Sequence, residues 1–364
     1  MATARYRWVV LLLSYVCMLA YGFGLQSVPP VLTLIVGELG LSYAEGGMLS
    51  SLFVLPAIFL SILAGMLADW WNPFRVGVIS LCLALAGALI FATSGSFVVA
   101  GLGRVIAGLG AATVSIQAAR MITQWFGRGG AGTAMGIYNT AMPVAAITSF
   151  STFGTLGQQS GWRTPIFVSA LVAVLALAAF LLLYRPAPAA APVGAAGQGR
   201  AGVGRSFSLR NVGSPIWLVA LCWMWFNAAS ISFSTFAPDF FVSRGYEIGA
   251  AGLLASLLMW GSLGLSPIIG RLTDRIGRHE LFIGAGGILL AIAISVVARA
   301  ESFIGPMLVM AVAVALVPAP VFSLPAKILA PQRLGFGFGV LSTLSSTGIF
   351  FGPYLAGVIR DRTQ

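Results

Sequence analysis

Long apolar runs separated by short polar gaps make up most of the chain. A helix needs about 20 predominantly apolar residues to cross the hydrocarbon core of a bilayer. By that measure the sequence predicts eleven membrane-spanning helices, at approximately 8–30, 46–68, 75–94, 97–121, 131–155, 164–184, 215–238, 248–270, 281–299, 303–325 and 335–358. Prolines at 29–30 and at 318 and 320 are expected to bend their helices. The pattern therefore predicts an all-α polytopic membrane protein.

The composition agrees with a chain whose outer surface faces lipid. Of its 364 residues, 59% are hydrophobic and 8% are charged, and the mean hydropathy is +0.97. A soluble globular domain carries about 25% charged residues, because its surface must face water. The composition therefore excludes soluble enzymes, nucleic-acid-binding modules, coiled coils and disordered tails.

The positive charges lie where membrane topology would place them. The net charge is +11, but the basic residues fall singly in short gaps between apolar runs, which argues against a nucleic-acid partner. With a cytoplasmic N-terminus, fourteen Lys and Arg residues lie on the cytoplasmic side and five on the opposite side. Positively charged loops stay in the cytoplasm, so we predict a multi-pass protein of the cell membrane with its N-terminus inside. The first apolar run continues past Leu19 without a cleavage site, which predicts a span rather than a signal peptide.

Two short motifs recur at one spacing. The pentapeptide GMLAD at 65–69 matches GRLTD at 270–274, and the R-x-G-x-G pattern at 128–132 recurs at 333–337, both 205 residues later. Two matches at one offset indicate an internal repeat. The repeat predicts two six-helix bundles related by a pseudo-two-fold axis.

The repeat divides the chain into three parts. We assign 1–184 to an N-terminal six-helix bundle, 185–213 to a cytoplasmic linker rich in Pro, Ala and Gly, and 214–364 to a C-terminal bundle. The C-terminal copy is shorter by about one membrane crossing, so it is expected to have five helices and to lack the twelfth. Gly357–Asp361 resembles the loop that would lead into that helix, which favours truncation over a natural eleven-span variant.

The sequence contains no recognisable catalytic or metal-binding grouping. Cys17, Cys82 and Cys222 lie singly inside apolar runs, with neither disulfide nor metal-ligand spacing. His279 is the one histidine, which argues against a histidine metal site or a catalytic triad. We therefore expect no catalytic residues, no metal, no cofactor and no enzymatic activity.

Two motifs resemble those of a known family. GRLTDRIGR at 270–278 resembles the signature G-x-L-x-D-R-x-G-R, which the major facilitator superfamily of secondary transporters carries between helices 2 and 3 and again between helices 8 and 9. An eroded first copy begins at 65, and RVIAGLG at 104–110 resembles the family's R-x-x-x-G-x-G motif. The resemblance covers nearly the whole chain, and it implies two helical bundles around a midplane site and transport by alternating access.

In this position the repeated signature is expected to form a gate that closes the cytoplasmic side. Its carboxylate can accept hydrogen bonds from a helix N-terminus, its cations can bridge to carboxylates, and its glycines let backbones approach. The candidate gating residues are Gly65, Asp69, Arg75, Gly270, Asp274, Arg275, Gly277 and Arg278. The alternative is that these charges only anchor short cytoplasmic turns. His279 and Glu280 are expected to be solvated loop residues.

Arg104 is the one basic residue that lies in the interior of a predicted span and not at its end. An arginine there costs roughly 2.5–3.5 kcal/mol and usually faces a cavity or a partner. Its guanidinium can bind a carboxylate or another oxyanion, although it can also serve structure or coupling, or extend to the interface. Asp239, the nearest carboxylate to a span interior, is expected to be a solvated cap. A buried cation without a buried anion favours an anionic substrate.

Polar and aromatic side chains suggest the rest of the cavity. Trp223, Asn227, Ser230 and Ser234 repeat at helical spacing on the span predicted at 215–238. The candidate substrate-binding residues are Arg104, Tyr21, Tyr138, Asn139, Trp223, Asn227 and Trp260. Taken singly, a residue of each of these six uncharged kinds is more often a packing or interface residue than a ligand.

The sequence therefore predicts a secondary transporter that moves a small, anionic solute by alternating access. One alternative is an exporter of amphiphilic or hydrophobic compounds, and another is a membrane sensor that transports nothing. The expected partners are a small-molecule substrate, the lipid bilayer and a coupling ion or counter-substrate. We expect the chain to act as a monomer.

Overall fold

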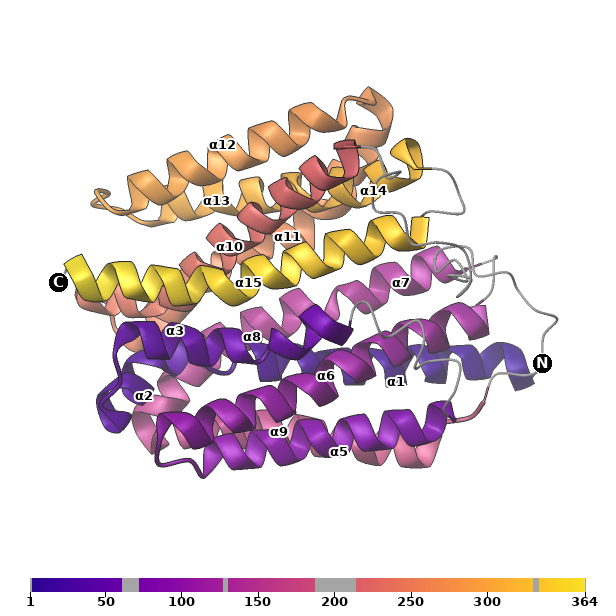
Figure 1. Ribbon diagram of the computed structural model, residues 1–364, viewed down its shortest axis with the longest axis horizontal. Coiled ribbons are helices and arrows are strands. Elements are labelled where there is room, and N and C mark those ends of the chain that lie inside the picture. The colour runs from indigo at the N-terminus through magenta and orange to yellow at the C-terminus, as the bar shows by residue number, and fades with distance from the viewer. Residues whose placement is uncertain (1, 61–71, 127–129, 187–213, 330–333, 364) are drawn as a thin grey trace.

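The computed structural model describes residues 2–60, 72–126, 130–186, 214–329 and 334–363, and every regular element in these ranges is a helix (Figure 1). We refer to the elements before residue 187 as the N-terminal half and to those from residue 214 as the C-terminal half.

The N-terminal half consists of helices of very different lengths, several of them short. Its elements are α1 (Ala2–Leu25), the 3-10 helix η1 (Pro29–Val31), α2 (Leu32–Leu39), α3 (Tyr43–Leu52), α5 (Pro73–Ala92), α6 (Phe97–Phe126), α7 (Ala131–Asn139), α8 (Ala141–Ser160) and α9 (Arg163–Leu183). Residues 55–60 are helical as well.

The C-terminal half has longer, less interrupted helices. Its elements are α10 (Ser214–Ser243), α11 (Ile248–Ile276), α12 (His279–Val297), α13 (Ile304–Leu316), α14 (Pro318–Ile328) and α15 (Leu334–Thr363). The predicted linker lies, from residue 187, outside the described residues, and the division into two repeated bundles stays a prediction.

Within the described ranges, eight helical segments are long and apolar enough to cross a membrane, judged by length and composition. The predicted all-helical membrane fold is therefore confirmed, whereas the number of eleven spans is not. The span predicted at 46–68 is interrupted because α3 ends at Leu52, shortly before Pro56. The span predicted at 131–155 is divided into α7 and α8 at Thr140.

Prolines interrupt helices where the sequence predicted bends. The chain leaves α1 at Leu25 and passes through η1, which begins with Pro29 and Pro30. In the same way α13 ends just before Pro318, the first residue of α14. Proline donates no backbone hydrogen bond and clashes with the preceding turn. The interruptions leave backbone carbonyls that need other donors.

Helices α5 and α6 pack backbone against backbone. A Cβ atom at Gly87 would overlap the backbone of Ala107, and a Cβ atom at Gly103 would overlap the backbone of Phe91. In a bilayer, helices associate largely through such close van der Waals contacts between small residues. This close packing fixes the position of α6, the helix that carries Arg104.

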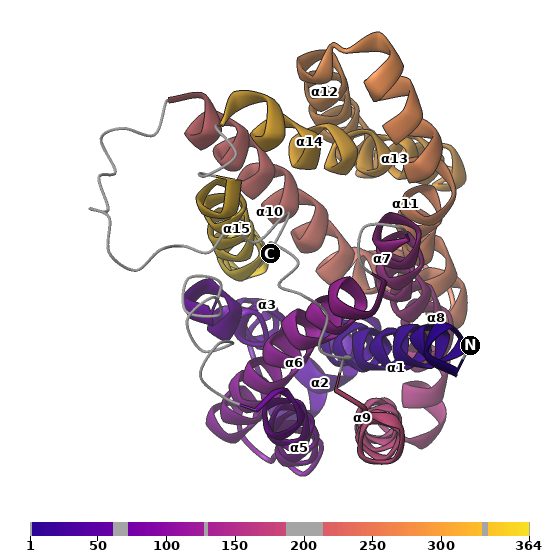
Figure 2. The same ribbon diagram turned by 90° about the vertical axis from the view of Figure 1, so that its right-hand side faces the viewer.

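The two halves meet at the end of the molecule where α10 and α15 finish and α3 and α11 begin, which we call the far end (Figure 1). Along this interface α3 packs against α15, and α8 packs against α11 (Figure 2). A Cβ atom at Gly47 would overlap the carbonyl of Pro353, and one at Gly252 would overlap the carbonyl of Phe150. The opposite end, which carries the N-terminus, we call the near end.

Helix α15 continues through Thr363, so Gly357–Asp361 is helical and not the expected loop. The reason is tertiary: the side chains of Arg360 and Asp361 find partners on α10 and α3 at the far end.

We expect Gly87→Ala to lower the free energy of unfolding by about 2 kcal/mol, because the added methyl group would force α5 and α6 apart. Thermal unfolding of the purified protein in detergent measures this. Gly284→Ala on α12 is the control, since nothing lies within 4 Å of a Cβ atom there. An unchanged melting temperature for Gly87→Ala would contradict the packing described.

Candidate functional site

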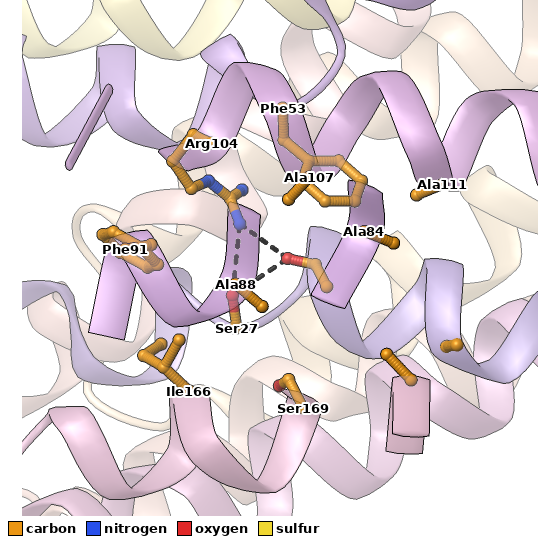
Figure 3. A pocket seen from close by; sticks show the side chains of 13 residues that line it. Ser27, Phe53, Ala84, Ala88, Phe91, Arg104, Ala107, Ala111, Ile166 and Ser169 are labelled. Carbon is orange, nitrogen blue, oxygen red and sulfur yellow. Dashed lines mark hydrogen bonds between the residues drawn. The ribbon is translucent and has the colours of Figure 1, made fainter. Parts of the chain in front are cut away.

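Arg104, on α6, is held by five hydrogen bonds, one for each N–H of its guanidinium group. Its acceptors are the backbone carbonyls of Gly24, Leu25, Leu49 and Ser50 and the hydroxyl of Ser27, at 2.6 to 3.5 Å. Figure 3 shows the bond to Ser27. These groups belong to α1, α3 and the turn after α1. Arg104 therefore joins three parts of the N-terminal half.

The four carbonyls are available because they lie at helix ends. Helix α1 ends at Leu25, so the carbonyls of Gly24 and Leu25 have no further helical turn to bond. After α3 the next two N–H groups bond back to Ser51, which frees the carbonyls of Leu49 and Ser50. The carbonyl end of a helix carries partial negative charge, so two helix ends stabilise the Arg104 cation.

Arg104 is sealed from solvent. It is 2% exposed, and its guanidinium carbon lies 4.6 Å from the ring centre of Phe53 and 5.5 Å from that of Phe91. The cavity beside it is about 20 Å³, room for about one water molecule (Figure 3). In this conformation a substrate could bond to Arg104 only by displacing one of its acceptors.

A larger cavity lies farther along α6. Its volume is about 110 Å³, and it is lined by Tyr21 of α1, by Ala57 and Leu60, and by Ala112, Ser115 and Ile116 of α6. The rings of Tyr21 and Phe53 meet edge to face, with centres 5.8 Å apart. The Tyr21 hydroxyl makes no hydrogen bond with any residue that the structure describes. Tyr21 therefore links the two places: it lines this cavity, and its ring contacts Phe53, which in turn contacts the Arg104 guanidinium.

Tyr138 and Asn139 separate although they are neighbours in sequence. Tyr138, on α7, is buried, and its hydroxyl donates to the carbonyl of Ser115 at 2.9 Å. It therefore lies next to the residue that lines the larger cavity. Asn139, at the end of α7, is exposed.

The candidates of the C-terminal half do not line this cavity. Trp223 is buried and stacks on Phe226, with ring centres 5.7 Å apart. Asn227 donates to the carbonyl of Trp223 at 2.7 Å, one turn back on α10. Trp260, on α11, is 53% exposed. Trp223 and Asn227 therefore make contacts within the C-terminal half, and Trp260 lies at its surface.

The signature at 270–278 forms the junction of α11 and α12 at the near end. Gly277 ends α11 with a positive φ of 74°, a conformation that suits glycine, and its N–H bonds the carbonyl of Thr273. Arg275 and Arg278 are exposed, as is Arg75 at the start of α5. Among the residues described, no ion pair links these arginines to the opposite half.

Three gating candidates lie wholly or partly outside the residues that the structure describes. Gly65 and Asp69 lie outside the described residues, and so does the side chain of Asp274. Gly270 lies within α11, where the nearest neighbour of a Cβ atom would be Ala319 at 3.8 Å.

Two residues expected to be solvated are buried instead. Asp239 is 3% exposed because it forms an ion pair with Arg360 and accepts a hydrogen bond from the Thr33 hydroxyl at 2.7 Å. His279 is 1% exposed and is the first residue of α12, not a loop residue. Both expectations were wrong, and for Asp239 the reason is its partners on α15 and α2.

The partners of Asp239 belong to a polar cluster at the far end that the sequence did not reveal. Arg360 also lies over the ring of Tyr43, with its guanidinium carbon 3.6 Å from the ring centre. The pKa of the Tyr43 phenol is raised, chiefly by burial and then by the Asp239 carboxylate. The one available signal was Ser42-x-x-Glu45, a capping-box pattern that predicts a helix start at this place.

Comparison with known proteins places the chain in a family. The model of the Major Facilitator Superfamily matches residues 14–353. The chain belongs to this superfamily. The resemblance inferred from the two sequence motifs is therefore confirmed.

The superfamily members most similar in sequence include several transporters. The "Probable nitrate/nitrite antiporter NarK1" of Thermus thermophilus is 28% identical over 74% of this chain and 60% of its own length. The "Lysosomal dipeptide transporter MFSD1" of Homo sapiens is 21% identical over 98% of this chain and 80% of its own. The "Probable sulfoacetate transporter SauU" of Cupriavidus necator is 23% identical over 91% and 82%. The match with NarK1 leaves about two fifths of that protein without a counterpart here.

Solved structures of the superfamily share the fold. A bacterial homologue of the human lysosomal transporter Spinster, in its inward-facing and occupied conformation, has a TM-score of 0.79 at 18% identity, covering 98% of this chain and 82% of its own. A D-xylose–proton symporter has a TM-score of 0.74 at 15% identity, covering 96% and 90%. These structures show the fold. The family match and the transporters among the sequence relatives identify the chain as a multi-pass membrane transporter of the Major Facilitator Superfamily and not an enzyme.

We expect Arg104→Met to lower the free energy of unfolding by at least about 3 kcal/mol, because buried carbonyls would lose their donor. Arg104→Lys keeps the charge but has three donors in place of five, so its loss should be intermediate. Thermal unfolding in detergent gives the order. If Arg104→Met is as stable as the parent, the guanidinium does not hold α1 and α3 together.

Proposed function

We propose that this transporter carries a small anionic solute, which enters the cavity lined by Tyr21 and Ser115. The observation that supports the proposal best is the Arg104 cation behind that cavity. Its four carbonyl acceptors are dipoles without net charge, so they weaken its field at longer range less than a carboxylate would. A unit charge at about 10 Å, in an effective dielectric constant of about 20, is worth about 1.7 kcal/mol.

The placement of negative charge supports the same sign of substrate. Within the described helices, the carboxylates lie at or near helix ends, and Asp239 already pairs with Arg360. A solute cation would therefore find no carboxylate partner in the middle of the described membrane helices. An anion would meet the Tyr21 hydroxyl and the positive potential of Arg104.

Two relatives agree with an anionic substrate. By their names, NarK1 transports nitrate and nitrite, and SauU transports sulfoacetate. MFSD1, a dipeptide transporter by name, shows that relatives at similar distance carry other solutes. Relatives therefore favour an organic or inorganic anion without naming it.

We further propose that the N-terminus lies in the cytoplasm, as the distribution of Lys and Arg favours. The far end then faces outward, and the packing of α3 on α15 and α8 on α11 closes it. The signature at 270–278 lies at the near end, where Arg275 and Arg278 are exposed. This arrangement fits an inward-facing state, in which the cytoplasmic gate is released. A coupling ion or a counter-substrate would complete the transport cycle.

We expect nitrate, nitrite or sulfoacetate to stabilise the purified protein in a thermal-unfolding assay. A ligand at about 100 times its dissociation constant adds roughly 2.7 kcal/mol. Neutral D-xylose and a lipophilic cation, tetraphenylphosphonium, should give no shift. Stabilisation by either of these two, with none by the anions, would contradict the proposal, and the lipophilic cation would favour an exporter.

Tyr21→Phe tests the site itself. We expect it to weaken binding of the stabilising anion about tenfold or more, because a hydrogen bond to a charged group is lost. Tyr246→Phe is the matched control, since Tyr246 packs against Phe303 at the far end, away from the cavity. Equal dissociation constants for the parent and Tyr21→Phe, measured by titration, would place the anion elsewhere.

A further inference from the structure

The last turn of α15 reaches across the far end to the N-terminal half. Arg360 and Asp361 are neighbours in sequence, yet their charged groups pair with different helices. Asp361 bonds α3 of the opposite half, whereas Arg360 pairs with Asp239 on α10 of its own half. The two residues therefore play different parts at the same contact.

Asp361 caps a helix of the opposite half. Its two carboxylate oxygens accept hydrogen bonds from the backbone N–H groups of Tyr43 at 2.9 Å and Ala44 at 2.8 Å. These are the first two residues of α3, where N–H groups lack helical partners and an anion is favoured. The hydroxyl of Ser42, the residue before α3, already accepts a hydrogen bond from the N–H of Glu45. The start of α3 is thus capped from its own half and from the opposite one.

The ion pair between Asp239 and Arg360 presents a neutral surface to the N-terminal half. Asp239 accepts from the Thr33 hydroxyl, and Arg360 covers the ring of Tyr43. Because both charges belong to the C-terminal half, separation of the halves would not pull them apart. A buried charge left without its partner is costly, and this arrangement avoids that cost during opening.

We propose that the end of α15 is the latch of the outward gate. Asp361 supplies the hydrogen bonds to α3 that break when the latch is released. The ion pair of Asp239 and Arg360 supplies the contacts with Thr33 and Tyr43. The latch closes the far end in the conformation described. Release of the latch then breaks the hydrogen bonds from Thr33, Tyr43 and Ala44 and the contact of Arg360 with the Tyr43 ring. Among the three charged residues of the latch, Asp361 alone loses its partners, because Asp239 and Arg360 stay paired.

The latch can be tested with a buried reporter thiol. Ser51, on α3, is 1% exposed, and its hydroxyl faces the carbonyl of Ile349 on α15. In a background with Cys82 and Cys222 replaced by serine, Ser51→Cys should react with a maleimide only when the far end opens. We expect Asp361→Ala to raise the labelling rate about tenfold, because two charge-assisted hydrogen bonds are lost.

Graded and matched variants sharpen this test. Asp361→Asn keeps the shape and one acceptor, so its rate should be intermediate, and Thr33→Val should raise the rate less than Asp361→Ala. Glu38→Gln is the control, because the exposed pair of Glu38 and Arg163 lies at the same end but within one half. Its labelling rate should equal that of the parent.

A second reporter separates opening from unfolding. Ser80→Cys lies on α5, buried within the N-terminal half, and it should stay protected in Asp361→Ala. Parental labelling of Ser51→Cys in Asp361→Ala would overturn the latch, and so would equal acceleration at both reporters. The assay needs no substrate, so its outcome does not depend on the anion proposal.

Discussion

A membrane offers no water to a backbone carbonyl, so each interruption of a helix inside it needs a donor from the protein. The N-terminal half has two such interruptions side by side, after α1 and after α3. One guanidinium group, that of Arg104, donates hydrogen bonds at both interruptions, and its five N–H groups bond five acceptors. The broken helices fix the place of the cation, and the cation holds the broken helices together. The buried positive charge of the N-terminal half follows from this arrangement.

The two ends of the molecule differ in how their charges are used. At the far end, the strongest charge pair lies within one half, and the opposite half contributes hydroxyl, ring and backbone N–H groups. Such a contact can open without leaving an opposite charge buried alone. At the near end, the described arginines of the 270–278 signature are exposed. A transporter that closes its two ends in turn must be able to open each of them again. At the far end, opening is easier because the groups that the N-terminal half contributes are uncharged.

The sequence predicted the membrane class, the helical fold and the family, because these depend on hydropathy, charge distribution and a nine-residue signature. It also singled out Arg104, because an arginine within a membrane span costs free energy unless it faces a cavity or a partner. It could not show that the acceptors of Arg104 are carbonyls, since carbonyls are present at every residue and only broken helices free them. Asp239 was expected in water because its partner, Arg360, is 121 positions away in the chain. Pairings of this kind depend on packing, which local patterns do not contain.

The most direct test of the anionic substrate is entrance counterflow in proteoliposomes. Vesicles loaded with unlabelled nitrate, nitrite or sulfoacetate would be diluted into the same labelled anion, so that exchange is followed without assuming a coupling ion. We predict transient accumulation of at least one labelled anion, slower at low concentration with Tyr21→Phe and unchanged with Tyr246→Phe. Counterflow of D-xylose or tetraphenylphosphonium without any of the anions would contradict a cavity shaped by the charge of Arg104.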